Sequence, residues 1–129
     1  MVGLVLVSHS RQIVEGLAEL VRQMAGEIPL AAVGGTADGR IGTDATAILS
    51  GIEAVWSEEG VLVLVDLGSA VMSTETALEL MDPARSGRVQ LSGAPLVEGA
   101  IAAGVEVMLG SALAEVRAAA ESALTQPKF

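Results

Sequence analysis

The chain opens with the stretch VGLVLVSHS, residues 2–10, and this stretch decides the fold. Its apolar run, Val2 to Val7, has the length of a buried β-strand, and a helical pattern begins near Ser10. The only histidine of the chain, His9, is therefore expected at the carboxyl end of a strand and at the amino end of a helix. Because α/β proteins place their chemistry at this point, His9 is a candidate nucleophile.

Further apolar runs of strand length alternate with longer segments of helical periodicity. This alternation predicts an α/β fold, a three-layer sandwich in which a mainly parallel four-stranded sheet lies between helices. The run VLVLV at 61–65 has no polar alternation, which is typical of a central strand covered on both faces. The predicted strands are Val2–Val7, Leu30–Val33, Val61–Val65 and Val89–Leu91.

Five segments have the apolar periodicity of helices. In the first, the predicted apolar face consists of Ile13, Leu17, Leu20, Val21 and Met24. The five helices are expected from near Ser10 to Gly26, from Thr43 or Asp44 to near Gly60, from Gly68 to Met81, from Pro95 to about Leu109, and from Ser111, as its N-cap, to Leu124. Because no linker interrupts the chain, we expect residues 1–125 to form one domain and residues 126–129 a tail.

Composition excludes several classes of partner. Seven Lys and Arg against 16 Asp and Glu give a net charge of −9, which repels nucleic acid backbones and anionic membrane surfaces. Although 51% of the residues are hydrophobic, no apolar run reaches the ~18 residues of a membrane span. The chain has no cysteine and its first residues do not resemble a signal peptide, so we expect a cytoplasmic location.

Right-handed crossovers bring the carboxyl ends of parallel strands to one edge of the sheet, so four loops are predicted to meet there. Each loop is small and rich in glycine, which allows close approach of a ligand, or in hydroxyl side chains, and each is followed by the amino end of a predicted helix. Such surroundings favour an anion, although tight turns use the same residue types. The candidate anion-binding or supporting residues are Ser8, Ser10, Gly34, Gly35, Thr43, Gly68 and Ser69.

Asp66 follows the most apolar strand, where a carboxylate is costly to bury without a partner. If this strand lies beside the first one, Asp66 can accept a hydrogen bond from one ring nitrogen of His9 and leave the other nitrogen free as the nucleophile. Alternatively, Asp66 caps the helix that follows it. Motifs for a P-loop, a serine-hydrolase elbow and a dinucleotide site are absent, and one histidine without cysteine does not make a usual zinc site.

Four segments together resemble a known family. The family is the phosphocarrier subunit of the dihydroxyacetone kinase that depends on the bacterial phosphotransferase system, and its first domain is similar to the IIA domain of mannose-type sugar transporters. The resemblance covers essentially the whole chain and implies the strand order 2-1-3-4. The segments are VSHS at 7–10, IGTDA at 41–45, VDLGSA at 65–70 with STETALEL at 73–80, and APLVEGA at 94–100.

The resemblance implies a phosphoryl relay. The histidine phosphocarrier protein HPr donates a phosphoryl group to His9, while Asp66 orients the imidazole. His9 then passes the group to ADP in the nucleotide-binding kinase subunit, DhaL, and the resulting ATP phosphorylates dihydroxyacetone on a third subunit, DhaK. The implied activity is that of a phosphotransferase with a phosphohistidine intermediate. ADP and magnesium belong to the partner subunit, and no cofactor is expected on this chain.

A homodimer is also expected, because family members form homodimers and because segment 96–124 is rich in Ala, Val, Leu and Gly on both helix faces. Two other functions stay open: a mannose-type IIA domain that donates to a IIB protein, and a non-catalytic flavodoxin-like module that binds a small anion. Since the chain ends at Phe129, we expect separate upstream proteins to supply the phosphoryl group, unless the chain is a fragment of a larger phosphocarrier.

Overall fold

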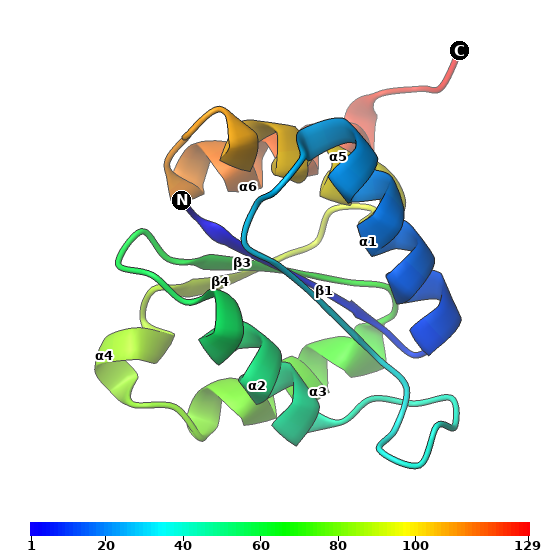
Figure 1. The fold of residues 1–129 in the computed structure, drawn as a ribbon, viewed down its shortest axis with the longest axis vertical. Helices are drawn as coiled ribbons and strands as arrows, with labels where there is room; N and C mark the ends of the chain where they lie inside the picture. The colour runs from blue at the N-terminus through cyan, green and yellow to red at the C-terminus, as the bar shows by residue number, and fades with distance from the viewer.

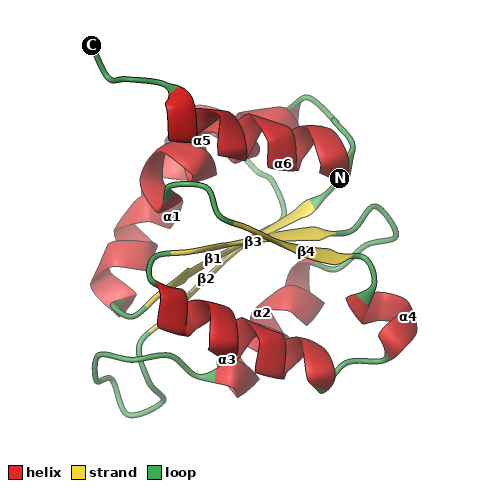
Figure 2. Cartoon of the chain, turned by 180° about the vertical axis from the view of Figure 1, so that it is seen from behind, coloured by secondary structure: helices red, strands yellow, loops and turns green.

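The computed structural model describes all 129 residues and shows a parallel sheet between two layers of helices (Figures 1 and 2). The sheet order is β2-β1-β3-β4, and the three neighbouring pairs are parallel. The predicted α/β sandwich and the strand order 2-1-3-4 are therefore confirmed. The strands are β1 (Gly3–Ser8), β2 (Leu30–Gly34), β3 (Val61–Val65) and β4 (Val89–Ser92).

Helices lie on both sides of the sheet (Figure 2). One side carries α1 (Arg11–Ala25), α5 (Leu96–Met108) and α6 (Leu113–Ser122), and a 3₁₀ turn, Ala123–Thr125, follows α6. The other side carries α2 (Ala45–Val55), α3 (Gly68–Glu79) and the short α4 (Pro83–Ser86). None of these helices combines the length and the apolarity that crossing a membrane requires.

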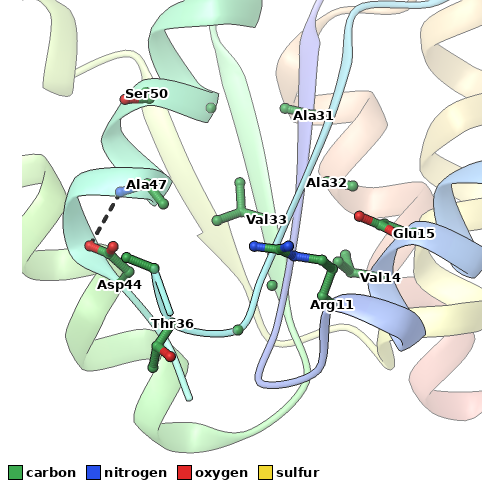
Figure 3. Close-up of a pocket in the computed structure, with 14 residues that line it drawn as sticks. Arg11, Val14, Glu15, Ala31, Ala32, Val33, Thr36, Asp44, Ala47 and Ser50 are labelled. Carbon is green, nitrogen blue, oxygen red and sulfur yellow. Dashed lines mark hydrogen bonds between the residues drawn. The ribbon is translucent and has the colours of Figure 1, made fainter. Parts of the chain in front are cut away.

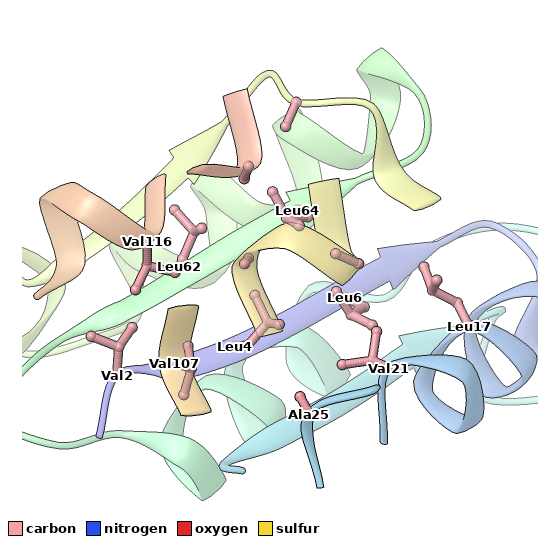
Figure 4. Close-up of a cluster of buried hydrophobic side chains, with 14 of the residues drawn as sticks. Val2, Leu4, Leu6, Leu17, Val21, Ala25, Leu62, Leu64, Val107 and Val116 are labelled. Carbon is pink, nitrogen blue, oxygen red and sulfur yellow. The ribbon is translucent and has the colours of Figure 1, made fainter. Parts of the chain in front are cut away.

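Two hydrophobic cores hold the three layers together. Alternate residues of a strand point to opposite faces of a sheet, so Leu4 and Leu6 of β1 face α1, α5 and α6 (Figure 4), whereas Val5 and Val7 face α2 and α3. These side chains are fully buried or nearly so. Each fully buried Leu or Val stabilises the fold by about 1.5–3 kcal/mol relative to an exposed one. The two cores fix β1 and β3, and with them the sheet edge that holds His9.

The start of α2 agrees with the prediction, whereas the start of α6 does not. Asp44 is the N-cap of α2, where its carboxylate accepts backbone hydrogen bonds. Ser111 does not cap α6, because its hydroxyl donates instead to Glu106 at 2.5 Å. Ala112 takes the N-cap position, and its N–H donates to Glu115 Oε1 at 3.3 Å. The predicted Ser111 cap is therefore wrong.

Two further boundaries differ from the sequence prediction. Helix α2 ends at Val55, well before Gly60, because Trp56 already has an extended backbone conformation. Helix α4 was not predicted, since a single turn is too short to show apolar periodicity. Its start nevertheless has a recognisable local signal: Asp82 caps the helix and Pro83 occupies the first helical position.

The buried face of α1 is rotated from the predicted apolar face. Val21 is fully buried as expected, but Ile13, Leu20 and Met24 are 55%, 47% and 56% exposed. Helix α5 packs on the Val21 side of α1, where glycine at 104 permits close contact: a Cβ at Gly104 would lie 2.8 Å from Val21 Cγ1. The apolar face of α1 is thus wider than the contact with α5 and the sheet, and part of it stays exposed.

Candidate functional site

His9 and Asp66 follow neighbouring strands at the carboxyl edge of the sheet. His9 comes directly after β1, and Asp66 comes directly after β3. The two strands pair with Val7 opposite Val65, and the Asp66 N–H donates to the Val7 carbonyl at 3.1 Å. The strand register thus places the imidazole and the carboxylate next to each other.

Four hydrogen bonds hold the Asp66 carboxylate in place. Its Oδ1 accepts from the Leu67 N–H at 2.7 Å and lies 2.9 Å from His9 Nδ1. Its Oδ2 accepts from the His9 backbone N–H and from the Ser8 hydroxyl, both at 2.9 Å. The His9 and Asp66 side chains are 19% and 18% exposed, so the pair is shielded from bulk water yet open to a reactant.

The same hydrogen bonds set the charge of Asp66. Partial burial raises the pKa of Asp66, but hydrogen bonds from His9, Ser8 and Leu67 outweigh burial and hold the pKa below its usual value of 3.8. The ionised carboxylate accepts from His9 Nδ1–H, so the neutral imidazole keeps its lone pair on Nε2. Asp66 is not the cap of α3: the N-cap position is Leu67, and no side chain caps this helix.

Nitrogen Nε2 of His9 faces the first turn of α3. It lies 2.5 Å from the Oγ of Ser69, the second residue of this helix. The backbone N–H groups of Gly68 and Ser69 have no intrahelical partner because they lie in the first turn of α3, and no side chain caps this helix. A helix start of this kind carries partial positive charge and binds anions. The arrangement can therefore hold a phosphoryl group attached to Nε2.

The other candidate hydroxyls make hydrogen bonds within the protein. Ser8 lies buried beneath the carboxylate just described, and Ser10 is the N-cap of α1. Thr43 Oγ1 lies 2.5 Å from the Oγ of Ser73 on α3, and this contact ties the loop before α2 to the helix that faces His9. These three hydroxyls stabilise the structure around the site, and none of them forms a hydrogen bond with the imidazole.

Gly34 and Gly35 lie against the start of α1. A Cβ at Gly34 would lie 2.7 Å from Val14 Cγ1 and 2.8 Å from the Ser10 carbonyl, so only glycine allows this approach. Gly35 has a φ of 76°, which favours glycine. Both glycines thus have a structural reason to be there, in the packing of β2 and its loop on α1.

A pocket of about 490 Å³ opens between α1, α2 and the outer edge of β2 (Figure 3). Arg11 extends into it from α1 and reaches beside Val33, without an ion pair or hydrogen bond. On the opposite wall, the Asp44 carboxylate is already engaged, because it caps α2 and accepts backbone hydrogen bonds. Neither His9 nor Asp66 lines this pocket, so it is separate from the imidazole site.

Two contacts of the site were not predicted. The Gly42 N–H donates to the His9 carbonyl at 2.9 Å and fixes the loop before α2 beside the imidazole. Ser73 is the partner of Thr43. A backbone N–H leaves no signature in a sequence, but Ser73 lies four residues after Ser69, and this helical spacing places the two serines on one face of α3.

The chain matches one family and several relatives. The family described as PTS system fructose IIA component, EIIA-man, matches residues 3–117. The phosphoryl donor subunit DhaM of the phosphoenolpyruvate-dependent dihydroxyacetone kinase of Klebsiella michiganensis is 44% identical over 128 residues, which are 96% of this chain and 27% of that subunit. The DhaM subunit of kinase 2 of Listeria innocua is 43% identical over 110 residues, which are 84% of this chain and 88% of that subunit.

The fold also matches a solved structure over its whole length. The crystal structure of EF1359, a protein of unknown function, has a TM-score of 0.85 and 32% sequence identity, and the match covers 100% of this chain and 99% of that one. The chain spans about a quarter of the Klebsiella subunit and most of the Listeria subunit. From the family match and these identities, the chain belongs to the EIIA-man family and is similar to the phosphoryl donor subunits of dihydroxyacetone kinases.

Proposed function

We propose that this chain carries a phosphoryl group on His9 between an upstream phosphocarrier and a kinase subunit. One observation carries the proposal: Asp66 holds Nδ1 of His9 while Nε2 faces the uncapped first turn of α3. Phosphoryl transfer needs mainly positioning and charge stabilisation around the moving group. The carboxylate supplies the positioning, and the helix start supplies the charge.

Each transfer forms one bond to phosphorus and breaks another. The Nε2 lone pair of His9 attacks the phosphorus of the donor's phosphohistidine, and the donor's N–P bond breaks with its electron pair left on the donor imidazole. The His9 ring becomes cationic, and the neighbouring Asp66 carboxylate stabilises this charge. In the second transfer a terminal phosphate oxygen of ADP attacks, the Nε2–P bond breaks, and the imidazole is neutral again.

Ser69 and the start of α3 are proposed to contact the phosphoryl oxygens. In the free protein the Ser69 hydroxyl donates to the Nε2 lone pair. Once that lone pair forms the N–P bond, the hydroxyl turns to a phosphoryl oxygen, which lies within its reach. The N–H groups of Gly68 and Ser69 meet the same oxygens without competition from a capping side chain.

The names of the relatives support the choice of partners. Both DhaM relatives described above are phosphoryl donor subunits of phosphoenolpyruvate-dependent dihydroxyacetone kinases. We therefore propose HPr as the donor, ADP with magnesium in the subunit DhaL as the acceptor, and DhaK as the subunit served indirectly, all in the cytoplasm. These names favour this acceptor over a IIB protein and over a non-catalytic anion-binding role.

Exposed apolar side chains next to the site support docking of these partners. Leu67 follows the site carboxylate directly, Met72 lies one turn further along α3, and Ile41 precedes the glycine that contacts the His9 carbonyl. All three are exposed large hydrophobic residues. Apolar side chains gathered at the rim of a site are typical of an interaction surface.

Phosphorylation by phosphoenolpyruvate, enzyme I and HPr tests the proposal. Intact mass spectrometry is expected to show one acid-labile phosphate on the wild-type chain and none on His9→Ala, because His9 is the only imidazole. Circular dichroism confirms that the variant is folded. Addition of the kinase subunits with ADP is then expected to discharge the label. Label that persists in His9→Ala, or that the kinase subunits fail to discharge, contradicts the proposal.

A further inference from the structure

Ser8 is the one polar residue of the site that is completely buried. It is the last residue of β1 and is 0% exposed, whereas His9, Ser10, Asp66 and Ser69 all reach the surface. Burying a hydroxyl is costly unless its hydrogen bonds are satisfied. A buried hydroxyl directly behind the reacting pair therefore calls for a physical reason.

The Ser8 hydroxyl makes two hydrogen bonds with opposite roles. It donates to Asp66 Oδ2 at 2.9 Å and accepts from the Ser10 N–H at 3.0 Å. Both directions are fixed, because the ionised carboxylate only accepts and the backbone N–H only donates. The Ser10 N–H thus orients the hydroxyl of Ser8 so that its proton points at the carboxylate.

The remaining contacts of Asp66 show what the hydroxyl adds. The Leu67 and His9 N–H groups hold one carboxylate oxygen each, and Ser8 is the only side chain besides the imidazole that holds either oxygen. Its bond to Oδ2 resists rotation of the carboxylate about the Cβ–Cγ bond. Rotation would take Oδ1 away from His9 Nδ1.

We propose that Ser8 is a positioning residue for phosphoryl transfer, which acts by locking the Asp66 carboxylate in the orientation that keeps the proton of His9 on Nδ1. This inference rests on the proposed function of His9. Without the hydroxyl, the carboxylate loses its side-chain anchor and the imidazole populates the tautomer with its proton on Nε2. That tautomer has no lone pair on Nε2 with which to attack phosphorus.

The chain contains a matched control at the end of another strand. Ser92, the last residue of β4, is 3% exposed, donates to Glu121 Oε2 at 2.7 Å and accepts from the Ala94 N–H at 3.1 Å. This is the same arrangement as at Ser8: a buried strand-end serine between a carboxylate and the N–H two residues on. Glu121 bonds Ser92 and Arg117 but not His9, so Ser92→Ala measures the structural cost of losing such a serine bridge without an effect on the imidazole.

The first measurement is the transfer rate from HPr for the wild type, Ser8→Ala and Ser92→Ala. Ser8→Ala is expected to slow transfer roughly tenfold, the usual scale for removing a residue that orients a catalytic group. Ser92→Ala is expected to transfer at the wild-type rate. Ser8→Cys fills nearly the same volume with a weaker donor, so it keeps the test available if the alanine variant unfolds, and it too is expected to transfer slowly.

The second measurement is the His9 ring tautomer in the unphosphorylated protein, read from its ¹⁵N chemical shifts. Ser8→Ala is expected to increase the share of the Nε2–H tautomer, which a merely structural role would not change. In the Asp66→Asn background, Ser8→Ala is expected to cause no further loss of rate, since its effect passes through the carboxylate. An unchanged tautomer, an equal rate loss in Ser92→Ala, or additive losses with Asp66→Asn overturns the inference. Because the tautomer is read without phosphate, the inference is tested even if the chain accepts no phosphoryl group.

Discussion

Asp66 carries the largest expected effect of any single side chain other than His9. Replacement by Asn keeps the size of the side chain but removes the charge that stabilises a cationic imidazole. We expect Asp66→Asn to fold and to transfer phosphate more slowly, by roughly 10- to 100-fold, as is typical when an orienting carboxylate is removed. Circular dichroism and rapid-quench transfer from HPr measure the two properties. A wild-type transfer rate would show that Asp66 only holds the neighbouring backbone N–H groups and does not assist transfer.

The pKa of Asp66 also makes a prediction about stability. Because hydrogen bonds hold this pKa below 3.8 in the folded protein, the carboxylate stabilises the fold at pH values above 3.8. This contribution is lost as the pH falls through the lowered pKa. Urea unfolding between pH 6 and pH 2.5 is expected to show a wild-type advantage over Asp66→Asn that shrinks below about pH 4. A difference in free energy of unfolding that stays constant over this range contradicts the prediction.

The residues around the imidazole could be predicted from the sequence, but the roles of several of them could not. His9, Asp66 and Ser69 are recognisable because each follows a strand or begins a helix, and the strand order brings them together. The roles of Ser8 and Thr43 could not be predicted from the sequence, because each hydroxyl forms a hydrogen bond with a residue at least 30 positions away. Such partners are set by strand register and loop path, which a local pattern does not contain.

At the scale of elements, the close packing of β2 on α1 should depend on the glycine at position 34. A Cβ at Gly34 would lie 2.8 Å from the Ser10 carbonyl and 2.9 Å from Arg11 Cα, and backbone atoms cannot move aside easily. We expect Gly34→Ala to lower the free energy of unfolding by about 1–3 kcal/mol. Chemical denaturation measures the loss.

A second glycine provides the matched control for this substitution. Gly16 lies within α1, and a Cβ there would meet no atom within 4 Å. Gly16→Ala is expected to raise the free energy of unfolding by about 1 kcal/mol, since alanine is the better helix former. If both substitutions had the same sign, close contact at Gly34 would not be what requires glycine there.

Whole elements were easier to predict than their ends. Apolar runs located all four strands to within one or two residues, most clearly β1 and β3, where burial on both faces leaves an uninterrupted pattern. Helix ends depend on single hydrogen bonds, and Ser111 shows the limit of such prediction: a serine placed to cap α6 bonds Glu106 instead. The turn of α4 is missed for a related reason, since it buries no residue and so has no apolar face to detect.

At the scale of the whole molecule, the exposed apolar side chains of α1 and α5 are the feature that bears on the expected homodimer. The two helices lie alongside each other (Figure 1), and Ile13, Leu20 and Met24 of α1 remain exposed together with Val97 and Met108 of α5. Monomeric proteins rarely expose extended apolar patches. We therefore propose that this α1/α5 surface buries itself against a second copy of the chain, which agrees with the homodimer implied by the family resemblance.

Light scattering at micromolar concentration tests the dimer. The wild type is expected to have about twice the 13.0 kDa mass of one chain. Leu20→Glu combined with Met24→Glu is expected to give a monomer, because two carboxylates would lose their hydration in an apolar interface. Leu80→Glu, at an exposed leucine beside α3 in the opposite layer, serves as the control and is expected to leave the dimer intact. A wild-type mass near 13.0 kDa contradicts the proposal, and a dimer that survives the α1 substitutions places the interface on another surface.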